Sequence, residues 1–329
     1  MESQIFWVNE DPSQEPVAIS NKTLETPDLA KLGISQKSWD ELEQSRQRTT
    51  PRFLFRGFHS LSGGGIDPRL NSTTGIVPHG FLHYPTEPWP PHLPPGSMFE
   101  TRALGSMIDA HLSGQLSKAA QTRFSSWAAS ISIAAKYARY NTTPHIAVVD
   151  TNLLPPYALV YHTPALARAH ISTNFYTEEY LIYGPVCGPA FSCVPFSELQ
   201  AARWWWNGTE RRLARAAERV EVARRIARTF ARKYNRRAEV VVALTAIIAS
   251  LGVSSAKVTR SELRREIPKQ LMWEITLMRL PAPPEVGLVN PRTYDKGYPE
   301  IQQMVSLLMD VEVICLVYMS IAFEKYIAH

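Results

Sequence analysis

Two adjacent carboxylates, Glu178 and Glu179, stand directly before an apolar run, Tyr-Leu-Ile-Tyr, that ends at Gly184. Aromatic and β-branched residues favour strands, so a strand is predicted to begin at these carboxylates. Neighbouring side chains of a strand point to opposite faces, and the two carboxylates therefore cannot line the same cleft. One of them is the better candidate for chemistry, although an acidic residue at the end of a strand is more often only solvated.

A cation and a glycine, Arg56 and Gly57, lie in an earlier β-prone segment, residues 51–59, ahead of the glycines of 63–65. A guanidinium offers a fork of donors that fits a phosphate, and glycine lets a backbone approach closely. These glycines match no Walker or Rossmann sequence. A surface arginine beside a hairpin is therefore the competing interpretation.

Two hydroxyls, Ser125 and Ser126, end a strand predicted for residues 122–127, just before an alanine-rich helix predicted for 128–138. They can cap that helix or hydrogen-bond a ligand. Capping explains them without any function, so the residues alone leave both roles open.

The whole chain has 329 residues, 45% hydrophobic and 20% charged, with a formal charge of +5. This is ordinary globular composition, and the modest positive excess suits acidic partners such as phosphates. Three cysteines occur without a CxxC pair or a nearby histidine at zinc spacing, which favours a reduced compartment and no structural metal. No secretory signal is apparent, and the apolar runs 240–251 and 311–323 are too short to span a membrane, so a cytoplasmic or nuclear location is expected.

The remaining elements follow from periodicity and breaker residues. Residues 1–50 are predicted to be a loosely ordered polar arm with a short helix at 38–46, and 78–95 an extended proline-rich loop. Further predictions are a helix at 99–116, a strand at 145–150, a turn with a short helix at 153–169, a strand at 190–196, and helices at 209–234, 240–251, 261–280 with a kink at Pro268, and 299–326.

The order of the segments 55–57, 124–127 and 178–182 resembles the ADP-ribosyltransferase fold. More narrowly, it is similar to the arginine–serine–glutamate branch, which includes cholera-like toxins, and to uncharacterised fungal proteins that carry such a domain. The resemblance implies an α+β fold, with a split β-sheet core at 51–200 that follows the arm at 1–50. A basic α-helical region at 201–329 would complete the chain.

The resemblance also implies roles for single residues. Arg56 would hold a phosphate and the ribose of NAD, which is a substrate here, and Gly57 would allow NAD to approach. Ser125 would brace the glutamate and the nicotinamide-side ribose, with Ser126 at the middle position of the family's Ser-Thr-Ser pattern. Glu179 would be the catalytic residue, because it directly precedes the apolar run. A fixed carboxylate there would stabilise the oxocarbenium-like charge that develops as the nicotinamide bond breaks.

Two positions depart from the family pattern. Thr177 stands where arginine-modifying members carry Glu and several others Gln, so the acceptor, protein or nucleic acid, stays open, with Thr177 and Glu178 on its side of the site. Trp127 replaces the last hydroxyl of the Ser-Thr-Ser pattern. If the register of the strand is shifted by one residue, Glu178 becomes the catalytic candidate.

The helix predicted at 209–237 is rich in arginine and follows Trp204, Trp205 and Trp206. Such a surface can track a phosphate backbone with the tryptophans as stacking platforms, whereas an amphipathic helix docked by its apolar stripe is the simpler interpretation. The expected function is an NAD ADP-ribosyltransferase with a macromolecular acceptor. The alternatives are an NAD glycohydrolase, an inactive binding module of the same fold, and a nucleic-acid-binding protein acting through this helix.

Overall fold

The computed structural model describes residues 35–59, 62, 70–82, 103–114, 122–138, 143–155, 158–201, 216–234, 237–250 and 260–271. Most of the polar arm, the glycines at 63–65, most of the proline-rich loop, the three tryptophans at 204–206 and the helix predicted at 299–326 lie outside these residues. The chain divides into two compact units, Met1–Cys193 and Val194–His329.

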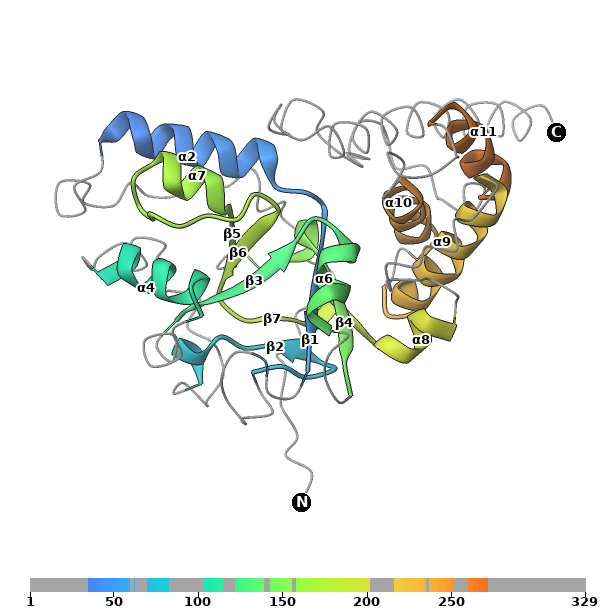
Figure 1. The fold of residues 1–329 in the computed structure, drawn as a ribbon, viewed down its shortest axis with the longest axis horizontal. Coiled ribbons are helices and arrows are strands. Elements are labelled where there is room, and N and C mark those ends of the chain that lie inside the picture. The colour runs from blue at the N-terminus through green and yellow to red at the C-terminus, as the bar shows by residue number, and fades with distance from the viewer. Residues whose placement is uncertain are drawn as a thin grey trace, which may run out of the picture. The chain divides into compact units, whose positions relative to one another are not determined.

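A six-stranded, mostly antiparallel sheet forms the centre of the first unit, with the strand order β5-β6-β3-β1-β4-β8 (Figure 1). A two-stranded ribbon, β2-β7, accompanies it. The strands are β1 (Phe53–Phe58), β2 (Gly75–Ile76), β3 (Phe124–Ala128), β4 (His145–Asp150), β5 (Leu159–His162), β6 (Glu179–Tyr183), β7 (Val186–Cys187) and β8 (Phe191–Pro195).

The predicted strands are confirmed at β1, β3, β4, β6 and β8, where β-prone residues run for four or more positions. β5 was missed, because the sequence analysis assigned 153–169 to a turn and a short helix. All four residues of β5 are buried. A short apolar run that is buried on both faces carries no period of two, so the pattern cannot separate it from a helix.

Helices cover the sheet of the first unit. They are α2 (Gln36–Thr49), α4 (Ala103–Leu112), α6 (Ile131–Ala138) and α7 (Thr163–Arg168), with short 3-10 turns η3 (His79–Phe81), η4 (Thr151–Leu153) and η5 (Gly188–Ala190). Trp39 and Leu42 of α2 are buried in one core cluster with residues of α4, α7, β3, β5 and β6. The helix predicted at 38–46 is therefore confirmed, whereas the loose order expected for 1–50 is wrong for 36–49, because these two apolar side chains anchor the helix to the core.

The opposite face of the sheet has a second core cluster. It includes Trp127 of β3, Tyr180 and Ile182 of β6, and residues of the β2-β7 ribbon such as Ile76 and Val186. β6 therefore has a core on both of its faces. A strand buried in this way is held firmly in register, because a slip by one residue would exchange its two sets of side chains.

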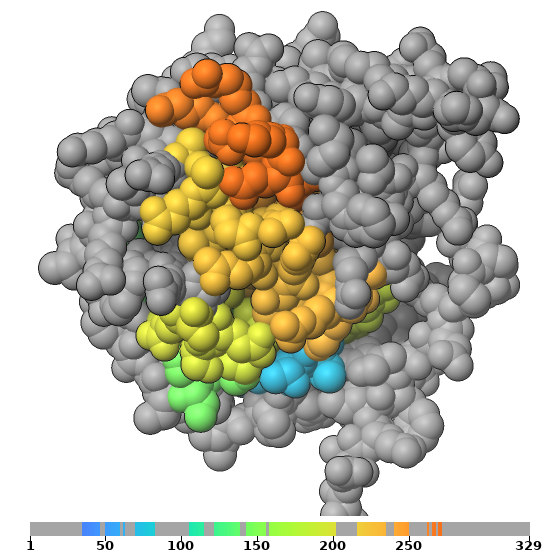
Figure 2. All heavy atoms as spheres, turned by 90° about the vertical axis from the view of Figure 1, so that its right-hand side faces the viewer, coloured from blue at the N-terminus to red at the C-terminus, as the bar shows by residue number. Residues whose placement is uncertain are grey.

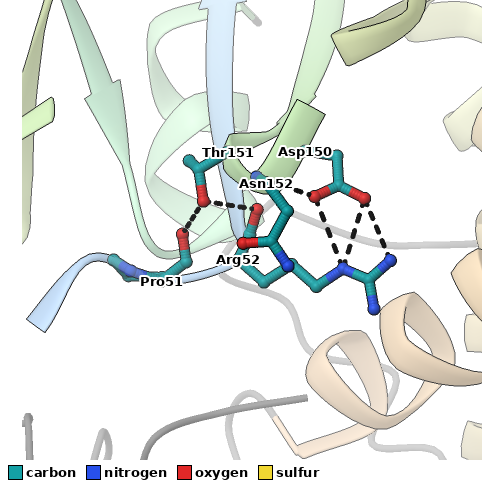
Figure 3. Close-up of polar contacts among 5 residues, drawn as sticks. All are labelled: Pro51, Arg52, Asp150, Thr151 and Asn152. Carbon is teal, nitrogen blue, oxygen red and sulfur yellow. Dashed lines mark hydrogen bonds and ion pairs between the residues drawn. The ribbon is translucent and has the colours of Figure 1, made fainter. Parts of the chain in front are cut away.

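The start of β1 is joined to the end of β4 by side-chain contacts (Figure 3). Asp150 is fully buried and pairs with Arg52, whose Nη2 lies 3.1 Å from its Oδ2. The Thr151 hydroxyl donates to the carbonyl oxygens of Pro51 and Arg52 at 2.8 and 3.1 Å. These bonds fix the strand that carries Arg56 four residues later.

The second unit is helical where it is described. Its helices are α8 (Phe196–Ala201), α9 (Ala216–Ala231), α10 (Arg237–Ser250) and α11 (Arg260–Gln270). The apolar stripe of α9 is buried at Val220, Ala227 and Phe230, and α9 contacts both α10 and α11. In Figure 2, α9 and α11 form one continuous yellow-to-orange surface. Over Ala216–Ala231 the helix is thus docked by its stripe, as the simpler interpretation expected, while residues 209–215 lie outside the described residues.

The described residues form a mixed α/β protein with a mostly antiparallel sheet and several helices. Within the described ranges, every helix is too short or too polar to cross a membrane.

Candidate active site

Three neighbouring strands, β6, β3 and β1, bring together the residues that the sequence analysis singled out. β1 and β3 are paired at Phe55 and Ala128, and Arg56 is the next residue of β1. Its Nη1 donates to the carbonyl oxygen of Ser126 at 2.7 Å, and its Nε and Nη2 donate to Oδ1 of Asn71 at 3.4 and 3.2 Å. The guanidinium is therefore held by fixed acceptors at the point where the two strands part.

Glu179 is the first residue of β6 and pairs with Ala128 of β3. It is half-buried, and burial raises the pKa of its carboxyl, while a hydrogen bond from the Ser126 side chain and the charge of Arg56 act to lower that pKa. Burial lowers the pKa of Arg56 to about 10, and the charge of Glu179 opposes that fall. The carboxylate and the guanidinium are thus close enough to stabilise each other's charged form.

Ser126, and not Ser125, is the serine of this site. Ser125 is only 3% exposed, and its Oγ accepts a hydrogen bond from the Trp127 indole at 2.8 Å. The expected contact between Ser125 and the glutamate is therefore wrong. The two serines point to opposite faces of β3, and the register of β3 against β6 places Ser126 on the face of Leu181.

Gly57 also has a different role from the one expected. A Cβ at this position would overlap the backbone carbonyl of Ala134, because α6 packs directly on β1. The backbone that approaches Gly57 is thus that of α6. The requirement for glycine is explained without any ligand.

His111 belongs to the site, although only its place within the helix predicted at 99–116 was expected. Its Nε2 lies 2.7 Å from Oγ of Ser126. Burial, and then the charge of Arg56, lower the pKa of His111 to about 4. The spacing of His111 beside Leu112 carries no signal of this role, because only the packing of α4 against the sheet brings the ring to β3.

The segment before Glu179 is held by hydrogen bonds at several residues. Asp109 accepts hydrogen bonds from the backbone amides of Thr173 and Asn174 and from the hydroxyls of Ser172 and Thr173. The Thr163 hydroxyl bonds both backbone groups of Tyr176. These contacts fix the backbone that leads to Glu179.

The two acceptor-side candidates, Thr177 and Glu178, form the turn that leads into β6. The carbonyl oxygen of Thr177 lies 2.7 Å from Nε2 of His162, and the amide of Glu179 donates to the carbonyl of Tyr176 at 3.0 Å. Glu178 precedes the strand, and its carbonyl oxygen accepts from the amide of Ala129 at 3.4 Å. Glu179 interacts with Ser126 and Arg56. Glu178 lies in the turn that directly precedes Glu179.

Two of three exposed aromatic side chains lie near the site. The exposed fractions of Tyr137 of α6, Phe175 and Tyr176 are 70%, 52% and 54%. They are the large hydrophobic residues with high exposure in the described part of the chain. Partial burial raises the pKa of the Tyr137 hydroxyl, and the charge of Glu179 and then Tyr176 add to this. Tyr137 and Tyr176 therefore lie near each other and near the carboxylate.

The arrangement suits stabilisation of positive charge more than acyl transfer. A serine hydrolase places its histidine between the serine and the acid. Here Ser126 stands between His111 and Glu179, so its hydroxyl serves the carboxylate. What the site offers is a half-buried, oriented carboxylate beside a fixed guanidinium, which is suited to a developing cation attached to a phosphate.

Comparison with known proteins finds a family that covers most of the first unit. A family model described as a domain of unknown function (DUF7587) matches residues 49–199, which include Arg56, Ser126 and Glu179. No curated protein and no solved structure matches the chain.

Proposed function

We propose that this chain is an NAD-dependent ADP-ribosyltransferase, which cleaves the nicotinamide glycosidic bond and transfers ADP-ribose to a macromolecular acceptor. One observation carries the proposal. Arg56, Ser126 and Glu179, which are far apart in the sequence, meet on three adjacent strands, and the arginine and the glutamate act on each other's charge. The arginine–serine–glutamate order and the strand contexts match the resemblance found in the sequence.

The residues have complementary roles in this chemistry. Glu179 stabilises the oxocarbenium-like ribose as nicotinamide leaves, and nicotinamide needs no acid to protonate it. Ser126 keeps the carboxylate charged and oriented through its hydrogen bond. Arg56, which remains charged at neutral pH, binds a phosphate of NAD.

The exposed aromatic side chains support a macromolecular acceptor. Tyr137, Phe175 and Tyr176 are the kind of residue that interfaces bury, and two of them lie near Glu179. An acceptor held against them would present its nucleophile beside the ribose.

The test measures nicotinamide release from NAD, with and without cell lysate. Glu179→Gln keeps the shape of the side chain without its charge, and we expect it to lower release at least 100-fold. Arg56→Ala should weaken NAD binding, while Arg168→Ala, an exposed change on α7, is the matched control with wild-type release. The proposal would be contradicted if the folded wild-type protein released nicotinamide and the Glu179→Gln variant released it at the same rate.

The lysate separates transfer from hydrolysis. Release that depends on lysate, with ADP-ribose found on a macromolecule, indicates a transferase. Lysate-independent release indicates an NAD glycohydrolase. No release from folded protein would favour the inactive binding module, and salt-dependent binding of nucleic acid would favour the basic helix as the functional surface.

A further inference from the structure

His111 reaches the site from α4, where Ile108 and Leu112 are buried and fix the helix against the core. Its Nε2 and Oγ of Ser126 are 2.7 Å apart, a short distance for a hydrogen bond between a ring nitrogen and a hydroxyl. The proposed chemistry requires Ser126 and Glu179 but gives no role to this ring.

Proton counting decides which atom donates. Ser126 and Glu179 lie on the same face of the paired strands β3 and β6, and the Ser126 side chain hydrogen-bonds the carboxyl. The hydroxyl has one proton and an ionised carboxylate can only accept, so the proton points to the carboxylate. Ser126 can then only accept from His111. Nε2 must therefore carry the hydrogen.

The electrostatics of the surroundings keep the imidazole neutral. Among the described residues, Arg56 on β1 acts on the charge of His111, Glu179 lies beyond Ser126 on β6, and Asp109 on the same helix is bound to the segment 172–174. The C-terminal end of α4 would favour a cation. Burial and the charge of Arg56 outweigh this, because together they lower the pKa of His111 to about 4.

We propose that His111 is a positioning residue: as a neutral imidazole protonated on Nε2, it donates to Ser126 and thereby directs the Ser126 hydroxyl proton onto Glu179. Arg56 holds the carbonyl oxygen of the same serine. The carbonyl oxygen and the hydroxyl of Ser126 are thus fixed, the first by Arg56 and the second by His111. The consequence for turnover rests on the proposed function, whereas the hydrogen bond can be tested without NAD.

The first experiment uses nitrogen and carbon NMR of the full chain in the absence of NAD. The wild-type ring of His111 is expected to be the Nε2–H tautomer at pH 7 and to stay neutral down to about pH 4. Ser126→Ala should shift its Nε2 signal. An Nδ1–H tautomer at pH 7 would overturn the proposal, because Ser126 would then donate to His111.

The second experiment titrates the Glu179 carboxyl in variants. His111→Ala should raise its pKa by about one pH unit, because a released hydroxyl no longer points to the carboxylate. His111→Gln keeps an N–H donor at a similar reach and should restore most of the wild-type value. His170→Asn is the matched control, since His170 is exposed and has a positive φ of 58°, which asparagine tolerates.

The titration distinguishes this inference from the proposed function. Identical Glu179 titration in wild type, His111→Ala and His111→Gln would overturn the positioning role even if NAD is cleaved. The expected shifts in a protein that releases no nicotinamide would support the positioning role and refute the proposed function. In an active enzyme, the acid limb of nicotinamide release should move upward by the same pH unit in His111→Ala.

Discussion

Ser125 and Ser126 are adjacent and chemically identical, yet they lie on opposite faces of β3. One accepts a hydrogen bond from Trp127 in the core, and the other lies between His111 and Glu179. Which serine meets the glutamate depends on strand register, and register is set by pairing with β6, a segment more than fifty residues away. The sequence alone therefore could not choose between them.

The two serines give a paired prediction. Ser125→Ala leaves the Trp127 indole without its buried acceptor and should cost ~1–3 kcal/mol of unfolding free energy while nicotinamide release persists. Ser126→Ala removes the acceptor of the less deeply buried His111, so it should cost less unfolding free energy than Ser125→Ala and lower release about tenfold or more. Urea unfolding and release assays on the same preparations check both. Loss of release in folded Ser125→Ala, with normal release in Ser126→Ala, would contradict the assignment.

At the scale of elements, α4 has two tasks: Asp109 holds the segment 172–174, and His111 meets Ser126. Burial acts to raise the pKa of Asp109, but its hydrogen bonds with Ser172, Thr173 and Asn174 together lower that pKa below its ordinary 3.8. The folded state therefore prefers the carboxylate. The contribution of the Asp109 carboxylate to the free energy of unfolding is complete above pH 3.8, the ordinary pKa, and disappears as the pH falls through the lower pKa of the folded state.

Asp109→Asn tests the link between α4 and this segment. We expect a loss of about 1 kcal/mol in unfolding free energy at pH 7, a figure reduced for solvent exposure. The difference from wild type should shrink below pH 3.8. Urea unfolding across pH measures it, and Asp40→Asn on α2, which is exposed, is the control. A difference that grows in acid would refute the role given to the charge.

The buried pair Arg52–Asp150 joins β1 to β4 at the strand end before Arg56. Arg52→Ala removes the cation and leaves Asp150 buried without it, so a loss of ~3–5 kcal/mol is expected. Lys37→Ala breaks only an exposed contact with Glu41 and should cost well under 1 kcal/mol. Thermal unfolding compares the two variants. Equal and small effects would mean that the buried pair contributes little to this strand end.

How far the sequence predicts these elements depends on the signal in each. The runs at 53–58, 145–150 and 179–183 are long and β-prone, and their strands could be predicted. β5 is short and buried on both faces, so no period marks it. The place of Glu179 at the strand start followed from its neighbours, whereas the role of His111 depends on tertiary packing.

At the scale of the whole molecule, the candidate site lies within one unit. Residues 1–193 form a compact unit, and the family match ends at 199, close to the end of α8 at Ala201. All described residues of the site come before this point. We therefore expect the first unit to assemble the site without the helical unit, whose own role is a separate question.

A fragment of residues 1–201 tests this independence. It keeps β8 and α8, and we expect a single cooperative unfolding transition in urea and nicotinamide release comparable with that of the full chain. Circular dichroism and the release assay measure the two properties. A fragment that aggregates or melts without cooperativity would show that the helical unit is needed for folding.

Residues before and after the turn from Tyr176 to Glu179 are expected to differ in how well they tolerate substitution. On one side, residues 173–176 are exposed and held mainly through Asp109 and Thr163. On the other, residues 180–183 are buried between two cores. Substitutions before the turn can change what the protein touches without moving the carboxylate, whereas substitutions after it alter the fold. Under the proposed function, acceptor preference can therefore diverge within this chain architecture while the chemistry at Glu179 stays constant.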